Sequence, residues 1–291
     1  MPEFNAMAEV APFGALLLGL IVGSFLNVVI LRLPRRMHAE LAEACADLRD
    51  EQAEPVTNRW FGLDYLITPA STCPHCGHAI RAWENIPVLS YLLLRGRCSN
   101  CQAQISVRYP LVEALTGLLS LGVVLHFGAT PAALAALVLL WGLVALTVID
   151  LDEQLLPDQL TLPLLWLGLL VNIDGLFTDL TSAVIGAAAG YLSLWLVFQV
   201  FRLITGREGM GYGDFKLLAV FGAFLGWQML PLVILLSSLI GAIVGIGLVV
   251  LRGRDRQIPI PFGPYLAAAG FVALLWGEQI NRSYLQLAGL A

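Results

Sequence analysis

The chain contains uncharged stretches that are too long for the core of a soluble protein. In residues 217–251 there is no Asp, Glu, Lys or Arg. A helix that crosses a bilayer needs about 20 predominantly apolar residues, so such a stretch predicts membrane-spanning helices. Charged residues make up only 13% of the chain, whereas soluble domains contain about a quarter. We therefore expect an all-α polytopic membrane protein that lives in a lipid bilayer.

Breaks in the apolar stretches predict about eight transmembrane helices. The first apolar run, 11–31, ends at the basic segment 32–36, which is typical of an uncleaved signal anchor. Residues 32–108 are too polar to insert. The later spans are a hairpin over 109–149 broken at 128–131, a hairpin over 159–201 broken at 172–182, a tight pair over 217–251 broken at 226–231, and a last span over 262–277.

The placement of Lys and Arg predicts the orientation in the membrane. In this topology all 16 basic residues except Arg282 fall on one side. Basic residues accumulate on the cytoplasmic side of membrane proteins, so we expect residues 32–108 to face the cytoplasm and both termini to lie outside. The net charge of −5 argues against nucleic acid as a partner, because no basic surface is present to meet phosphates.

Two Cys-x-x-Cys pairs stand in the long polar segment. They are Cys73/Cys76 and Cys98/Cys101, separated by 21 residues. Two pairs at such a spacing bring four thiolates to one tetrahedral centre, which is typical of structural zinc. The predicted cytoplasmic location is reducing, so disulfides are disfavoured there. We predict a small zinc-ribbon-like domain inserted after the first helix; a redox pair is the alternative.

Two aspartates lie where apolar helices are expected to meet water. Asp150 follows one such helix and Asp214 precedes another. Charges at membrane depth are costly and indicate function. Two neighbouring carboxyl groups can share a proton, so that one activates water and the other protonates a scissile carbonyl. Gly211 and Gly213 would leave room for an extended peptide beside Asp214. Helix caps, or an ion pair with Lys216, are the structural alternatives.

Functions other than hydrolysis are also compatible with these carboxylates. Asp158 follows Pro157 and precedes a helix, so it is expected to be an N-cap. Asp150, Asp158 and Asp214 could instead form the proton or cation relay of a transporter. Transporter sites usually lie near the bilayer midplane, whereas these residues cluster at one edge, which favours hydrolysis. A non-catalytic assembly factor that docks a partner through its zinc domain is a third alternative.

An ordered set of short motifs covers nearly the whole chain and resembles the bacterial type IV prepilin peptidases. Besides the cysteine pairs, the motifs are Gly23-Ser-Phe-Leu-Asn27, Arg32-Leu-Pro34, Trp83-Glu-Asn-Ile-Pro87, Arg108-Tyr-Pro-Leu-Val-Glu113, Asp150 with Leu156-Pro-Asp158, Gly211-Tyr-Gly-Asp214 and Pro259-Ile-Pro-Phe-Gly-Pro264. Each motif is short, and the specificity comes from their order.

The resemblance implies a bifunctional enzyme of the bacterial inner membrane. Such enzymes remove the basic leader from type IV prepilins and type II secretion pseudopilins, then methylate the new N-terminal residue with S-adenosylmethionine. It implies that Asp150 and Asp214 are catalytic and that the four cysteines belong to a cytoplasmic domain. The domains would be 1–31 with the first helix, 32–108 with zinc, and 109–291 as a seven-helix membrane peptidase.

The sequence gives less information about the methyltransferase activity. No glycine-rich dinucleotide-binding fingerprint follows a predicted strand, so the residues that hold the methyl donor are not located. A peptidase without methyltransferase activity stays an alternative.

Overall fold

The computed structural model describes residues 2–47, 64–68, 70–252 and 260–287. In this part of the chain all regular elements are helices, apart from isolated β-bridges near the cysteine pairs. The predicted all-α polytopic class is thereby confirmed. The chain forms two compact units, Met1–Leu125 and His126–Ala291. The predicted functional division at residue 108 stays a prediction.

The first unit is built on two long helices with the cysteine-bearing segment between them. Its elements are α1 (Pro2–Asp47), α2 (Asp64–Ile67), the 3-10 helix η1 (Ala82–Asn85), α3 (Leu89–Leu93) and most of α4 (Arg108–Phe127). Helix α1 continues through Pro34 to Asp47, well beyond the apolar run that ends at residue 31. Hydropathy marks where lipid contact ends, whereas this helix continues into a polar segment.

Small residues let α1 and α4 approach closely. A Cβ atom added at Gly19 would lie 2.5 Å from Ser120 Oγ, and one at Gly23 would lie 2.7 Å from the Cα of Glu113. Gly19 and Gly23 are four residues apart on one face of α1, the spacing used where membrane helices pack backbone to backbone. The Asn27 side chain also donates to the carbonyl of Tyr109 at 3.2 Å, tying the two helices at one end.

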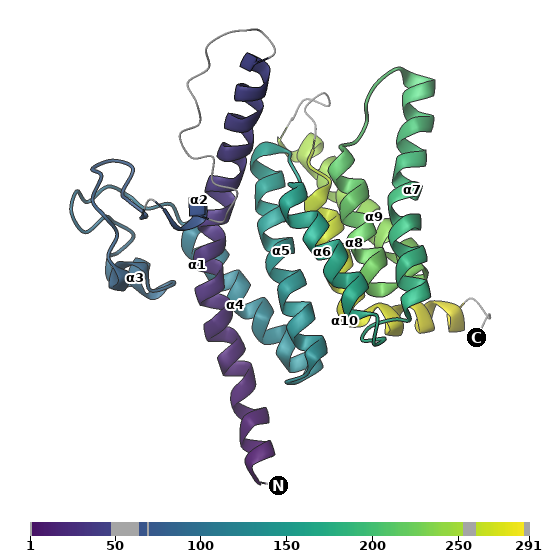
Figure 1. Cartoon of the computed structure of the whole chain (residues 1–291), viewed down its shortest axis with the longest axis horizontal. Helices are drawn as coiled ribbons and strands as arrows, with labels where there is room; N and C mark the ends of the chain where they lie inside the picture. The colour runs from purple at the N-terminus through teal and green to yellow at the C-terminus, as the bar shows by residue number, and fades with distance from the viewer. Residues whose placement is uncertain (1, 48–63, 69, 253–259, 288–291) are drawn as a thin grey trace. The chain divides into compact units, whose positions relative to one another are not determined.

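The second unit is a bundle around the short helix α8 (Figure 1). Its elements are α5 (Pro131–Glu153), α6 (Asp158–Val171), α7 (Leu180–Thr205), α8 (Tyr212–Leu225), the 3-10 helix η2 (Trp227–Met229), α9 (Leu230–Arg252) and α10 (Gly263–Leu287). Helix α8 packs against α6, α7 and α10, and its residues from Asp214 to Phe224 are buried, apart from Lys216. The most enclosed helix of this unit therefore begins at Tyr212, two residues before Asp214.

Five helical segments in the described chain are long and apolar enough to span a membrane: Val10–Ala46, Arg108–Phe127, Pro131–Glu153, Leu180–Thr205 and Trp227–Leu248. Helices α6 and α8 have 14 residues each, a length of about 21 Å, which is short of a hydrocarbon core about 30 Å thick. The eight predicted membrane helices coincide in position with α1 and α4 to α10. The number of complete crossings stays a prediction.

The predicted helix breaks are confirmed and have local causes. Thr130 caps α5 by accepting the N–H of Ala133 at 3.2 Å. Asn172, in the loop after α6, is fully buried and donates to the last carbonyls of α8, on Ala223 and Phe224, at 2.8 and 3.0 Å. Helix ends leave such carbonyls unsatisfied, so one side chain closes α8 and fixes the loop beside it.

Candidate catalytic and metal sites

The structure brings Asp150 and Asp214 together inside the second unit. Asp150 lies in the last turn of α5 and Asp214 in the first turn of α8. Their exposed fractions are 5% and 7%, and the two carboxyl groups are close enough for their charges to interact. Two residues 64 positions apart, each singled out from the sequence, thus form one buried acidic pair.

The two carboxyl groups have different surroundings. Asp150 Oδ2 accepts the backbone N–H of Gly263 at 3.0 Å. Asp214 Oδ1 is the one buried side-chain oxygen in the described residues that has no hydrogen-bond partner. An unpaired buried polar atom costs about 1–3 kcal/mol, so such an atom indicates a place where water or a ligand binds.

Gly263 is a component of this site that the sequence did not identify. It is the first residue of α10, and a Cβ atom there would lie 2.6 Å from Asp150 Oδ2. A side chain at this position would displace the carboxylate that the Gly263 N–H holds. The sequence signal was the segment 259–264, which carried part of the family resemblance but no assigned role.

The two glycines before Asp214 have different surroundings. A Cβ atom at Gly213 would lie 2.6 Å from the Cβ of Leu156, so this glycine lets α8 pack against the loop after α5. At Gly211 the nearest atom would be Asp214 Oδ2, at 3.8 Å, which leaves space beside the carboxylate. Gly213 is thus closely packed, whereas Gly211 is not; a role of either glycine in substrate binding stays a prediction.

Asp158 does not belong to the buried pair. The prediction that it caps α6 is wrong, because Pro157 occupies the N-cap and Asp158 is the first helical residue. Its carboxylate accepts two hydrogen bonds from Lys216 Nζ, at 2.6 and 2.8 Å, and the side chain is half exposed. Lys216 therefore neutralises Asp158 and leaves the buried pair without a lysine partner.

The four cysteines of the paired motifs converge in the first unit. Their sulfur atoms all lie within 4.8 Å of one another. The Cys73–Cys101 and Cys76–Cys98 sulfur distances are 3.8 and 4.0 Å. A disulfide needs about 2.05 Å, whereas tetrahedral zinc with Zn–S bonds of about 2.3 Å places its sulfurs about 3.8 Å apart. The arrangement suits one shared metal ion.

Both Cys-x-x-Cys turns adopt the same backbone conformation. The N–H of Gly77 donates to the carbonyl of Cys73 at 2.9 Å, and that of Gln102 donates to Cys98 at 3.1 Å. Both donor residues are left-handed, with φ of 69° and 60°. Glycine adopts this conformation freely, while Gln102 adopts it at a cost of about 1–2 kcal/mol. The two turns present their thiols as equivalent halves of one site.

Backbone amides favour the thiolate form at this cluster. The N–H of His78 lowers the pKa of the Cys76 thiol to about 7, and the N–H of Cys101 lowers the pKa of Cys98. At Cys101 the N–H of Ala103 acts in the same direction, but burial and the three neighbouring thiols raise its pKa to about 11. The thiolate is the form that binds metals, and it is favoured at Cys76 and Cys98.

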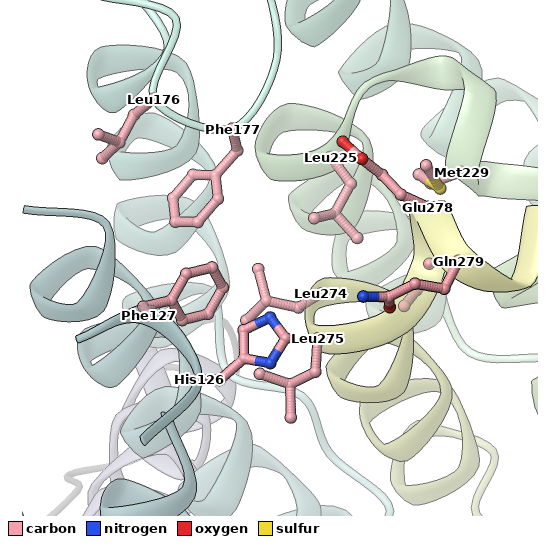
Figure 2. Close-up of a pocket in the computed structure, with 12 residues that line it drawn as sticks. His126, Phe127, Leu176, Phe177, Leu225, Met229, Leu274, Leu275, Glu278 and Gln279 are labelled. Carbon is pink, nitrogen blue, oxygen red and sulfur yellow. The ribbon is translucent and has the colours of Figure 1, made fainter. Parts of the chain in front are cut away.

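A cavity of about 260 Å³ lies elsewhere in the second unit. Figure 2 shows His126, Phe127, Phe177, Leu225 and Gln279 around it. Leu225 ends α8, whereas Asp214 lies in its first turn. Eleven residues of helix separate them by about 16 Å, so the cavity is not the site of the buried acidic pair.

Comparison with known proteins gives the same family for both units. Residues 17–127 match the bacterial peptidase A24 N-terminal domain, and residues 137–246 match the type IV leader peptidase family. A prepilin leader peptidase/N-methyltransferase of Pseudomonas aeruginosa is 59% identical, over 94% of this chain and 93% of its own length. Proteins with the same name from Stutzerimonas stutzeri, 57% identical over 95% and 94%, and Aeromonas hydrophila, 59% identical over 92% of each, are also similar. No solved structure matches.

Proposed function

The chain belongs to the type IV leader peptidase family, and from that premise we propose that Asp150 and Asp214 are its catalytic pair. It is an enzyme with the peptidase and N-methyltransferase halves of that family. The proposed reaction removes the basic leader of type IV prepilins and type II secretion pseudopilins. The new N-terminal residue is then methylated with S-adenosylmethionine as the donor.

One observation carries the peptidase proposal: two buried carboxyl groups from different helices lie together, and one has an unpartnered oxygen. The Gly263 N–H stabilises negative charge on Asp150. We therefore assign Asp150 as the ionised base that takes a proton from water. Asp214 is the acid that donates its proton to the scissile carbonyl oxygen as water adds to the carbon. When the C–N bond breaks, Asp150 gives the proton it took from water to the leaving amine, and Asp214 takes a proton back from a hydroxyl of the intermediate.

Burial of the pair supports this division of labour. Two carboxyl groups in one enclosed site share a single proton rather than ionise together. The open space beside Gly211, on the side of Asp214 Oδ2, is where an extended substrate backbone would approach the Asp214 carboxyl group. In this arrangement the unpartnered oxygen gains its hydrogen bond when the substrate carbonyl is bound.

The substrate class fits a site at the end of membrane helices. A prepilin presents an apolar helix with a basic leader at its cytoplasmic end, so its scissile bond would reach the depth of α5's last turn.

We place the enzyme in the bacterial inner membrane, with both sites facing the cytoplasm, from the distribution of Lys and Arg. A membrane-impermeant maleimide should then label the exposed Cys45 only from the cytoplasmic face, and labelling from outside would reverse this orientation.

Zinc is the proposed resident metal of the cysteine cluster. Cys73, Cys76, Cys98 and Cys101 would hold it as four thiolates, which matches the preference of structural zinc. The ion supplies folding energy to a small domain with little core. No step of peptide hydrolysis involves it.

Mass spectrometry of a prepilin incubated with the purified protein and S-adenosylmethionine tests both activities. We expect loss of the leader and one added methyl group on the mature N-terminus. Leader loss without methylation would support the peptidase-only alternative. If the substrate stays intact although the protein is folded and zinc-loaded, transport or docking would be favoured. The structure weighs against the transporter relay, because Asp158 is paired with Lys216.

A further inference from the structure

The cysteine-bearing part of the first unit exposes an apolar surface where a soluble domain would be polar. The surface is formed by residues 82–93, which contain η1 and α3; we call these residues the interfacial segment. Its exposed fractions reach 53% at Trp83, 64% at Leu92 and 73% at Leu93, and Ile86 and Leu89 are also exposed. Contiguous exposed apolar side chains of this kind mark a contact with another protein or with lipid.

A hydrogen bond fixes the depth of the interfacial segment relative to the membrane. The backbone N–H of Val88 donates to Glu113 Oε2 at 2.7 Å. Glu113 lies five residues into α4, a candidate membrane span, which is about 7.5 Å along the helix axis. Val88 is therefore held beside the first turns of a candidate membrane span.

The backbone of the segment is strained at the same point. Val88 has φ 60° and ψ −47°, and the N–H of Leu89 bonds the carbonyl of Pro87 at 2.5 Å. This is a γ-turn with positive φ, a rare and strained conformation, and a β-branched residue is especially unsuited to it. Such strain persists only where surrounding groups hold it, and the Glu113 carboxylate is the group bonded to Val88.

Charge and aromatic placement match a lipid surface. Trp83 belongs to the residue types enriched at membrane interfaces. Arg95 and Arg97 follow α3 and are exposed, and no carboxylate in the described residues forms an ion pair with either one. Basic side chains next to an apolar face are attracted to the phosphates of anionic lipids.

We propose that the interfacial segment is a membrane-interface element that lies in the leaflet next to the start of α4, with its apolar side chains among acyl chains. On α4 itself, Leu111 and Leu115 are exposed. The bond between Glu113 and Val88 holds the cysteine domain at this depth. The proposal does not depend on the assignment of the catalytic pair.

The test is fluorescence of the full chain in nanodiscs of phosphatidylcholine and phosphatidylglycerol. The chain has seven tryptophans, so the Trp83 signal is taken as wild type minus Trp83→Phe. Acyl chains brominated near the headgroup should remove most of this signal, and aqueous iodide should leave it. Quenching by iodide but not by brominated lipid would overturn the proposal. If added prepilin then protected Trp83 from iodide, the surface would be a substrate contact and not a lipid contact.

Paired variants test the role of Glu113. Glu113→Gln keeps an oxygen that can accept the Val88 N–H, so quenching by brominated lipid should persist. Glu113→Leu has no acceptor for this N–H, so quenching of Trp83 by brominated lipid should be lost while the zinc content is retained. Leu92→Asp and Leu93→Asp alter exposed positions without touching packing and should also transfer Trp83 to water. Gln104→Asp, an exposed position outside the segment, is the matched control; lipid quenching that is unchanged in the Leu92 and Leu93 variants would contradict the proposal.

Discussion

At the scale of residues, the site depends on how one backbone group holds one carboxylate. The Gly263 N–H reaches Asp150 across 113 positions of sequence, and Asp214 keeps a buried oxygen without a partner. In the proposed mechanism, this asymmetry gives two chemically identical side chains different roles. The two aspartates could be predicted because each stands at the end of an apolar run. Gly263 and the Asp158–Lys216 pair could not, because they depend on contacts through space that no local pattern encodes.

Gly263→Ala should impair cleavage without unfolding the protein. The new Cβ would lie 2.6 Å from Asp150 Oδ2 and would displace the carboxylate. A misplacement of about 1 Å in a catalytic group costs roughly 100-fold in rate. The measurement is kcat/KM for prepilin cleavage beside the thermal unfolding midpoint. Gly247→Ala, at a glycine with no atom within 4 Å of the added Cβ, is the control, and wild-type activity in Gly263→Ala would disprove this role.

Zinc should depend on four cysteines and not on the fifth. We expect purified wild type to contain one zinc ion per chain by elemental analysis. Serine at Cys73, Cys76, Cys98 or Cys101 should lower that content, because each sulfur lies in the shared cluster. Cys45→Ser is the matched control, since this exposed thiol stands outside it. Iron in place of zinc, or equal loss in the control, would refute the assignment.

At the scale of helices, glycine sets how α8 is buried. Backbone meets backbone where α7 and α8 pack: a Cβ at Gly222 would overlap the carbonyl of Gly186, and one at Gly190 would lie 2.7 Å from the carbonyl of Leu218. This contact fixes α8 and hence Asp214. The helix breaks were predictable from Gly, Pro and Asn. The ends of α1 and the lengths of α6 and α8 were not, because hydropathy reports lipid contact and not where hydrogen bonding of a helix stops.

Gly222→Ala should destabilise the second unit. The added methyl group meets main-chain atoms that cannot rotate away, and such overpacking costs about 1–3 kcal/mol. Gly122→Ala on α4 is the control, because its Cβ would have no atom within 4 Å. The stabilities of the two variants are compared by unfolding them in detergent and monitoring the loss of the helical circular dichroism signal. Equal stability of both variants would show that the α7–α8 contact is looser than described.

At the scale of the whole molecule, the cysteine cluster and the buried acidic pair lie in different units. The first carries the cysteine cluster, and the second carries the buried acidic pair. Membrane residence, the all-helical class and the family could be read from composition and motif order. The residues that hold S-adenosylmethionine could not, because the chain shows no nucleotide-binding motif with a known local geometry.

We propose that Asp150 and Asp214 together cleave the leader. The most direct measurement is prepilin cleavage by Asp150→Asn, Asp214→Asn and Asp158→Asn, each purified, shown to be helical and zinc-loaded. Asparagine keeps the shape of the side chain but cannot exchange the proton, so the first two variants should lose at least about 1,000-fold in rate, while Asp158→Asn stays near wild type. Cleavage at the wild-type rate by either Asp150→Asn or Asp214→Asn would contradict the account.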